Sequence, residues 1–319
     1  MDIKVDLLRV GGTENLAVSD CPVEDPQAGE IRVRQTGIGV NFIDIYQRMG
    51  LYPLPLPATL GVEGAGIVEA IGAGVDGLDV GDHIAYAGVV GGYRATRLLP
   101  AWRAIKLPKD LNLDVAAVSF LKGMTAHMLL TQTYPVQHGT VLLIHAAAGG
   151  LGGLLTRWAK HLGAEVIGTV SSQEKADIAT ANGCDHIILG RDAELVKEVK
   201  CINDGQGVDY VIDGIGGTML RKSFECTRPF GTVASIGQVA GPIPDISMNE
   251  LRCLSLAAPS VMAYGAQQDR YKRAGQAVLA ALDQNIFPEI GLTLPLAEAA
   301  KAQDALEDGK TSGSVLLVL

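Results

Sequence analysis

The stretch from Thr140 to Ser172 constrains the fold more than any other part of the chain. It starts with an unbroken apolar run, Val141–Ile144, which has the length of a strand buried on both faces of a parallel sheet. A turn of small residues, AAAGGLG, follows, and the periodicity predicts a helix from Leu151 to Leu162. Gly163 ends that helix, and Glu165–Val170 is the next strand. The stretch therefore predicts a strand, turn, helix and strand in succession.

The turn resembles a phosphate-binding loop. The usual fingerprint is GxGxxG, and here Ala147 replaces the first glycine, which leaves AxxGxxG counted from Ala146. Small residues let the backbone approach a pyrophosphate, and the free N–H groups at the start of the helix attract phosphate. Similar turns also occur where no ligand binds. The strand before the turn and the helix and strand after it favour a dinucleotide site.

The end of the second strand distinguishes NADP from NAD. Chains that bind NAD usually present Asp or Glu there to the ribose 2′-hydroxyl. This chain presents Ser171 and Ser172, with Lys175 shortly after. Because no carboxylate repels a 2′-phosphate, and two hydroxyls and an ammonium can bind it, NADPH is favoured. The alternative is that Lys175 is an ordinary solvated helix residue.

Composition excludes several classes of protein. The formal net charge is −9 without a long basic run, so no nucleic-acid surface is expected. Apolar runs are strand-sized, and no basic and apolar leader opens the chain, which predicts a cytoplasmic protein without a membrane span. The five cysteines lack CxxC spacing and the six histidines lack metal-site spacing. Reduced thiols and no metal site are expected.

A length of 319 residues predicts two domains. Up to about residue 104, short strands alternate with Gly, Pro and Asp turns, which indicates a β-rich, barrel-like domain. Its clearest strands are Glu30–Arg34, Ala65–Ile71, His83–Tyr86 and Arg94–Leu99. A helical pattern from Leu113 to Thr133 leads onward. The last segments read as helices at Asp269–Asp283 and Leu296–Leu306 and a strand at Ser314–Leu319.

Six strand-like cores recur through the second part of the chain, with room for one crossover helix between successive strands. They are Val141–Ile144, Glu165–Val170, His186–Leu189, Val208–Asp213, Gly231–Ile236 and Leu254–Ala257. This alternation predicts an α/β domain with a doubly wound, six-stranded parallel sheet.

Five segments together carry a resemblance to a known family: GVNFIDIY, GVEGAG, SFLKGMTA, HAAAGGLG and GKTSGSVLL. They resemble the zinc-free quinone oxidoreductases of the medium-chain dehydrogenase/reductase superfamily, the zeta-crystallin relatives. The resemblance implies a split GroES-like β-barrel catalytic domain, residues 1–122 and 259–319, and a Rossmann domain, residues 123–258. It also implies NADPH as the cofactor and a homodimer.

The same resemblance bears on metal chemistry. Zinc-dependent members of the superfamily carry Cys where Asn41 stands and His where Val62 stands. Catalytic zinc polarises an alcohol or carbonyl oxygen, so alcohol oxidation is not expected of this chain. A quinone is already electron-poor. Its reduction needs orientation and a hydrogen bond to the developing oxyanion more than it needs a metal.

Site residues are carried over where the motifs match. The catalytic candidates, expected as hydroxyl and amide donors, are Asn41, Tyr46, Tyr52 and Thr125. For the two tyrosines, aromatic packing is the alternative. The cofactor candidates are Asn41, Thr125, Ala148, Gly149, Gly150, Leu151, Ser171, Ser172, Lys175, Arg191, Ile215, Ile236, Gly237 and Lys310. Gly190 stands where the family often has Tyr, and Lys310 also reads as an ordinary surface lysine.

Three functions remain open from the sequence. The first is metal-free and flavin-free hydride transfer from NADPH to a quinone. The second is NADPH-dependent reduction of the double bond of an enone or enoyl thioester, in which a Tyr protonates the α-carbon. The third is a non-catalytic role, because zeta-crystallin relatives include lens proteins and RNA binders. The acidic composition disfavours RNA.

Overall fold

The computed structural model describes residues 2–190, 193–251 and 253–319. They divide into two units, Met1–Met124 with Gly265–Leu319 and Thr125–Tyr264. The domain boundaries expected from the sequence, at 122/123 and 258/259, stay a prediction. One predicted cofactor residue, Arg191, lies outside the described residues.

The second unit is built on a six-stranded parallel sheet in the order β11-β10-β9-β12-β13-β14. Its strands are β9 (Val141–Ile144), β10 (Glu165–Val170), β11 (His186–Leu189), β12 (Val208–Asp213), β13 (Thr227–Ser235) and β14 (Ser255–Ala257). Its helices are α4 (Gly150–His161), α5 (Gln173–Ala181), α6 (Leu195–Ile202), α7 (Met219–Cys226) and α8 (Val261–Tyr264). The order runs outward in both directions from β9, so the expected doubly wound Rossmann sheet is confirmed.

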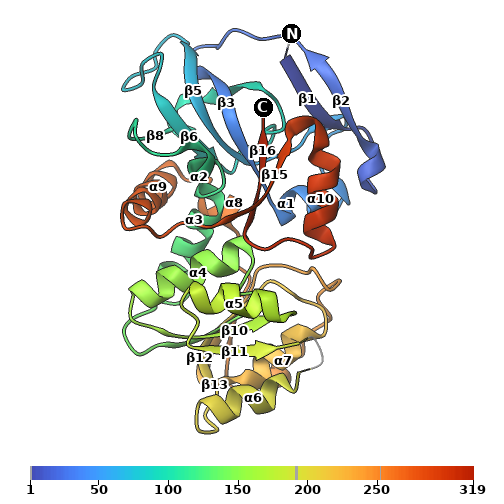
Figure 1. Ribbon diagram of the computed structural model, residues 1–319, viewed down its shortest axis with the longest axis vertical. Coiled ribbons are helices and arrows are strands. Elements are labelled where there is room, and N and C mark those ends of the chain that lie inside the picture. The colour runs from blue at the N-terminus through green and yellow to red at the C-terminus, as the bar shows by residue number, and fades with distance from the viewer. Residues whose placement is uncertain (1, 191–192, 252) are drawn as a thin grey trace. The chain divides into compact units, whose positions relative to one another are not determined.

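Both faces of this sheet are covered by helices (Figure 1). On one face, Leu143 and Ile167 of the sheet form a buried cluster with Leu220 and Phe224 of α7. Helices α4 and α5 cover the opposite face. Burial on both faces explains why these strands read as continuous apolar runs, which made them recognisable in the sequence.

The first unit is β-rich and contains the expected GroES-like domain. A seven-stranded sheet has the order β15-β16-β3-β5-β6-β8, with β7 also on β3, and a smaller sheet has the order β2-β1-β4. The strands are β1 (Asp2–Leu7), β2 (Leu16–Cys21), β3 (Glu30–Val40), β4 (Ala58–Thr59), β5 (Glu63–Ile71), β6 (His83–Ala87), β7 (Thr96–Pro100), β8 (Ile105–Lys106), β15 (Ile290–Pro295) and β16 (Ser314–Val318). Its helices include α1 (Phe42–Arg48), α2 (Leu113–Ala117), α9 (Gln268–Asp283) and α10 (Ala299–Glu307).

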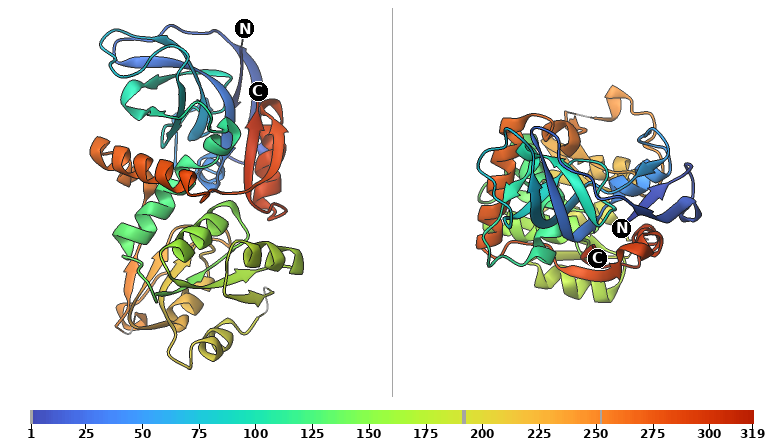
Figure 2. Two further views of the ribbon diagram at one scale, coloured as in Figure 1. Left: turned by 60° about the vertical axis from the view of Figure 1, so that its left-hand side comes forward. Right: turned by 90° about the horizontal axis from the view of Figure 1, so that it is seen from above.

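The C-terminal strand closes the first unit. β16 pairs antiparallel with β3, with Val315 opposite Val40, and parallel with β15 (Figure 2). Val315 and Leu317 of β16 are buried in one cluster with Ile38 of β3 and Leu296. The two ends of the chain therefore share one hydrophobic core.

The helical pattern from Leu113 to Thr133 does not form a single helix, and that prediction is wrong. Helix α2 ends at Ala117, helix α3 (Phe120–His127) starts afresh, and a wider helical turn covers Met128–Thr133. In the first turn of α3, the Leu121 N–H donates to Glu63 Oε2 at 2.8 Å. No helix in the described part of the chain is long and apolar enough to cross a membrane.

A carboxyl group lies in the core of the first unit. Asp44 on α1 is fully buried, and its Oδ2 accepts hydrogen bonds from the Asn41 N–H at 2.9 Å and the Tyr93 hydroxyl at 3.0 Å. Its Oδ1 and the buried Gln47 Oε1 both lack a donor among the described residues. Burial raises the pKa of Asp44 to about 7, and the nearby Glu63 contributes to the increase while Lys122 opposes it.

This raised pKa predicts a pH-dependent stability. The folded state binds the Asp44 proton more tightly than the unfolded chain does, so the contribution of Asp44 is greatest below pH 4 and is lost as the pH rises through 7. Asp44→Asn keeps an oxygen acceptor and removes the charge. The free energy of unfolding of this variant minus that of wild type should therefore increase between pH 4 and pH 8, by at most about 4 kcal/mol. Urea unfolding of both proteins across this range measures it, and a constant difference would contradict the assignment.

Candidate functional site

The turn between β9 and α4 is tightly folded. Ala146 has φ of +53°, a left-handed conformation that is uncommon for a residue with a side chain, and its carbonyl accepts from the Gly149 N–H at 2.9 Å. Gly149 is the N-cap of α4, and no side chain caps this end of the helix. The first amides of α4 are therefore available to a ligand at the carboxyl edge of the sheet.

Gly152 allows this helix to approach the turn. A Cβ atom on Gly152 would lie 2.3 Å from the carbonyl oxygen of Ala146 and 2.9 Å from Cα of Ala147, and both contacts are with backbone. Only glycine fits at this position without moving the helix away. Close packing of this kind is the role of the third glycine in dinucleotide-binding turns.

A chain of side-chain hydrogen bonds ties together the ends of three strands. The buried His145, after β9, is 3.0 Å from the Ser223 hydroxyl and 3.1 Å from the Thr169 hydroxyl. Ser223 donates to Asp213 Oδ2 at 2.8 Å, so its oxygen accepts from the His145 Nε2–H and leaves Nδ1 to accept from Thr169. Burial lowers the pKa of His145, which keeps the imidazole neutral.

Asp213 extends this connection to the next loops. Its Oδ1 accepts from the backbone N–H groups of Ile215 at 2.8 Å and Gly216 at 3.0 Å. Its carbonyl accepts from the Ile236 N–H at 2.8 Å. The structure therefore brings Ile215 and Ile236, two predicted cofactor residues, to the same carboxyl edge, and Gly237 directly follows Ile236 in the chain.

The predicted phosphate-binding residues follow β10. Ser171 and Ser172 are exposed, and the Ser172 hydroxyl caps helix α5 by accepting from the Lys175 N–H at 3.3 Å. Gly190 has φ of +103° at the end of β11. Capping uses the oxygen of Ser172 and leaves its hydroxyl hydrogen to donate.

In the first unit, two of the catalytic candidates are neighbours. The rings of Tyr46 and Tyr52 meet edge to face with centroids 5.7 Å apart, and Phe42 packs 6.2 Å from Tyr46. Tyr46 is buried, whereas 49% of Tyr52 is exposed. Aromatic packing therefore accounts for much of the Tyr46 surface, and Tyr52 is the more accessible of the two hydroxyl-bearing rings.

Asn41 belongs to a buried polar cluster that the sequence did not reveal. Its Oδ1 accepts from Lys122 Nζ at 2.8 Å, and its Nδ2 donates to Glu63 Oε1 at 2.8 Å. Lys122 also pairs with Glu63 at 2.8 Å. Neither Glu63 nor Lys122 was a predicted site residue. The available signal was a charged residue inside each of the otherwise apolar segments GVEGAG and SFLKGMTA.

Two further candidates, Thr125 and Lys310, lie outside the clusters described above. Thr125 is partly buried on α3. Lys310 is exposed and pairs with Asp308 at 2.7 Å. Among the described residues, no group of three or more His, Cys, Asp or Glu side chains could hold a metal ion.

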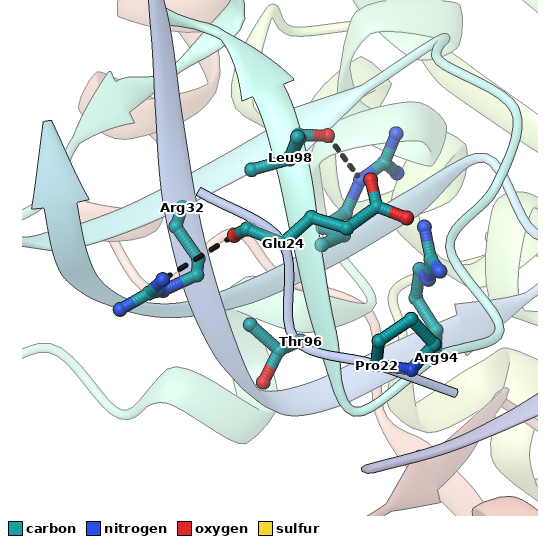
Figure 3. A pocket seen from close by; sticks show the side chains of 7 residues that line it. Pro22, Glu24, Arg32, Arg94, Thr96 and Leu98 are labelled. Atoms are coloured by element: carbon teal, nitrogen blue, oxygen red, sulfur yellow. Dashed lines mark hydrogen bonds between the residues drawn. The ribbon is translucent and has the colours of Figure 1, made fainter. Parts of the chain in front are cut away.

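An arginine-lined pocket on the first unit contains none of the predicted residues (Figure 3). Arg32 there bonds to Asp25 at 2.8 Å. Arg97 lies over the Tyr86 ring at 4.4 Å and donates to the carbonyls of residues 89, 90 and 98. Arg94 is the third arginine of this lining, and the buried Arg94 Nε, Arg32 Nε and Thr96 Oγ1 have no hydrogen-bond partner among the described residues.

Comparison with known proteins agrees with this architecture. Residues 27–109 match the alcohol dehydrogenase GroES-like domain family, and residues 150–279 match the zinc-binding dehydrogenase family. The chain is 39% identical to a 2-haloacrylate reductase of Burkholderia sp over 97% of this chain and 96% of that protein. It is 35% identical to quinone oxidoreductase 1 of Escherichia coli strain K12 over the full length of both.

Solved structures give the same result. The crystal structure of Escherichia coli quinone oxidoreductase complexed with NADPH superposes with a TM-score of 0.95 at 34% identity, over 99% of this chain and all of that one. A quinone oxidoreductase of Pseudomonas syringae pv. Tomato DC3000 also has a TM-score of 0.95, at 37% identity over both full chains. With both domains matched, this chain belongs to the quinone oxidoreductase-like oxidoreductases of the medium-chain dehydrogenase/reductase superfamily.

Proposed function

We propose that this chain is an NADPH-dependent quinone reductase that works without metal or flavin. The turn between β9 and α4 carries the proposal, because Gly152 brings the uncapped start of α4 against Ala146 at the edge of the sheet. Relatives named as quinone oxidoreductases, one of them solved with NADPH, support it.

The residues of the second unit fit NADPH chemically. The N–H groups of Gly150 and Leu151, at the start of α4, would hold the pyrophosphate, and Ala148 and Gly149 of the preceding turn would line it. Ser171, Ser172 and Lys175 would bind the 2′-phosphate, since Ser172 retains a hydroxyl hydrogen and no carboxylate follows β10 directly. We assign Ile215, Ile236 and Gly237 to the nicotinamide end, and Thr125, Arg191 and Lys310 remain proposed contacts.

NADPH, when bound, supplies a hydride. The chain itself orients the acceptor and donates a hydrogen bond to the oxygen that gains negative charge. We assign this donation to the hydroxyls of Tyr46 and Tyr52, of which Tyr52 is the more exposed. Asn41 is less suited to it because its amide nitrogen already donates to Glu63 and Gly39. A proton taken up with the hydride completes reduction to the hydroquinone.

A second acceptor class has a specific observation in its favour. The relative with 39% identity is named a 2-haloacrylate reductase, and a haloacrylate offers a carbon-carbon double bond beside a carboxylate. A tyrosine hydroxyl could protonate the α-carbon of such an acceptor, or of an enone or enoyl thioester.

We further propose that the active form is a homodimer.

The proposed chemistry predicts the acceptor range and the response to chelators. NADPH oxidation should proceed with small quinones, exceed that with 2-enals, 2-haloacrylates and enoyl-CoA, and persist in EDTA. Steady-state rates across this panel measure both effects. Faster turnover of the alkenes would replace the quinone assignment with double-bond reduction, and a loss of turnover in EDTA that zinc restores would contradict the metal-free mechanism.

The proposed 2′-phosphate site predicts a loss of cofactor discrimination in Lys175→Met. Removing one ammonium contact should weaken NADPH binding by about tenfold and leave NADH binding nearly unchanged, because NADH lacks the phosphate. Fluorescence titrations of both dinucleotides measure the ratio. Lys197→Met is the matched control, since this lysine of the same unit is exposed on α6 and pairs with Glu194 on the surface. An equal loss for NADH would show that Lys175 does not contact the phosphate.

A further inference from the structure

Three arginine side chains line one pocket of the first unit, beside the segment that follows β2 (Figure 3). Arg32 forms an ion pair with Asp25 at 2.8 Å and lies 3.5 Å from a carboxylate oxygen of Glu69. In the described part of the chain, Arg94 and Arg97 have no carboxylate partner. Two of the three positive charges are therefore not paired with an opposite charge.

The charge of Arg97 is buried. Only 4% of the residue is exposed, and its guanidinium carbon lies 4.4 Å from the centre of the Tyr86 ring. Its N–H groups donate to the carbonyls of residues 89, 90 and 98. Carbonyl dipoles and a ring face stabilise this charge but do not neutralise it, and a buried charge is costly unless an opposite charge accompanies it. An anion beside Arg97 would lower that cost.

Arg94 provides the hydrogen-bond donors that such an anion needs. Its Nε is buried without a partner, and its other guanidinium nitrogens have no acceptor among residues 2–190, 193–251 and 253–319. The N–H groups on one edge of a guanidinium form a fork that fits two oxygens of a carboxylate or phosphate. Thr96 lines the same pocket, is 6% exposed, and its Oγ1 also has no partner within these residues. The fork of Arg94 and the hydroxyl of Thr96 can therefore donate to the same oxyanion.

Glu24 contributes a carboxylate to the lining of this pocket. Its carbonyl accepts from Arg32 Nη1 at 3.3 Å, which fixes the backbone of the exposed segment after β2. Its carboxylate forms no hydrogen bond or ion pair with a described residue, and in Figure 3 the side chain extends toward Arg94. The Glu24 carboxylate can swing toward Arg94 or away from it, so it is an internal competitor for a ligand of the same chemistry.

We propose that this pocket binds a small oxyanion, a carboxylate or phosphate group, through Arg94 and Thr96 and beside the charge of Arg97. A water molecule could also accept from Arg94, but it has no charge to offset the two guanidinium groups. Glu24 competes with the oxyanion for Arg94. All of these residues belong to the first unit, and the proposal is independent of the dinucleotide site and of the proposed reaction.

Chemical modification of arginine tests the site residue by residue. Arg94 is partly exposed, so phenylglyoxal should modify it, and mass spectrometry of peptides measures the rate. Sodium phosphate or sodium acetate at about 50 mM should slow this reaction at least about fivefold, which corresponds to a dissociation constant of about 10 mM or below. Sodium chloride at the same ionic strength should change the rate by less than about 1.5-fold, because a spherical ion does not match the fork. The oxyanion that protects at the lower concentration identifies the ligand class.

Arg273 is the matched control within the same protein. It is exposed on α9 of the same unit and does not line the pocket. Its modification should proceed at nearly the same rate in all three salts. Equal slowing of Arg94 and Arg273, or slowing of Arg94 by chloride as strongly as by the oxyanions, would show general screening and overturn the proposal. No slowing of Arg94 by either oxyanion would overturn it as well.

Thr96→Val separates a ligand contact from a hydroxyl that is merely buried. Valine keeps the branched shape and removes the donor, so the oxyanion concentration that halves the modification of Arg94 should rise about fivefold. A hydroxyl that contacts no ligand predicts a different result. The variant would then unfold at a higher urea concentration than wild type, with the protection of Arg94 unchanged, and this outcome would overturn the role of Thr96.

Glu24→Gln tests the competition. Removal of this carboxylate should lower the half-protecting oxyanion concentration about fivefold. Asp20→Asn is the matched control, because it removes the same charge from an exposed position of β2, and it should change that concentration by less than about twofold. Equal effects of the two variants, or no effect of Glu24→Gln, would overturn the role of Glu24.

Discussion

The close approach of helix α4 to the turn before it is the contact on which the second unit depends. Gly152 has no side chain, and a Cβ atom there would lie 2.3 Å from the Ala146 oxygen. The start of the helix can therefore lie at the carboxyl edge of the sheet, where its amides are available to a ligand. The hydrogen bonds that join His145, Ser223 and Asp213 hold neighbouring strand ends in register with this turn.

In the first unit, a neutral amide lies between two opposite charges. Asn41 contacts an ammonium and a carboxylate that are both buried. Each of these groups has a partner, which is the condition for burying charge without a large loss of stability. The same neighbourhood contains Asp44, whose pKa burial raises to about 7.

The sequence predicted the Rossmann sheet well because its strands are buried on both faces. Strands β9 and β12, for example, have the expected bounds, Val141–Ile144 and Val208–Asp213. The split GroES-like fold followed from the motifs rather than from periodicity. Strand β15 was not predicted, because its residues alternate between partly buried and exposed and leave a weaker apolar signal than a continuous run.

The parts of the site that depend on tertiary contacts could not be predicted. The left-handed Ala146 is determined by the close packing of α4, and nothing about an alanine indicates it. Helix α2 ends at Ala117 although the helical pattern of the sequence continues past it. Beyond this break, the Leu121 N–H donates to Glu63. The cluster of Asn41, Glu63 and Lys122 joins three motifs that are far apart in the chain, and only their pairing in space explains why each contains a polar residue.

The central claim is that the turn between β9 and α4 binds the dinucleotide. Amide hydrogen exchange with and without NADPH tests it most directly, because the proposed contacts are backbone N–H groups at the start of α4. We expect slower exchange at Gly150 and Leu151, with a smaller effect at residues 171–175, on addition of NADPH. Unchanged exchange at Gly150 and Leu151 at a saturating NADPH concentration would contradict the claim.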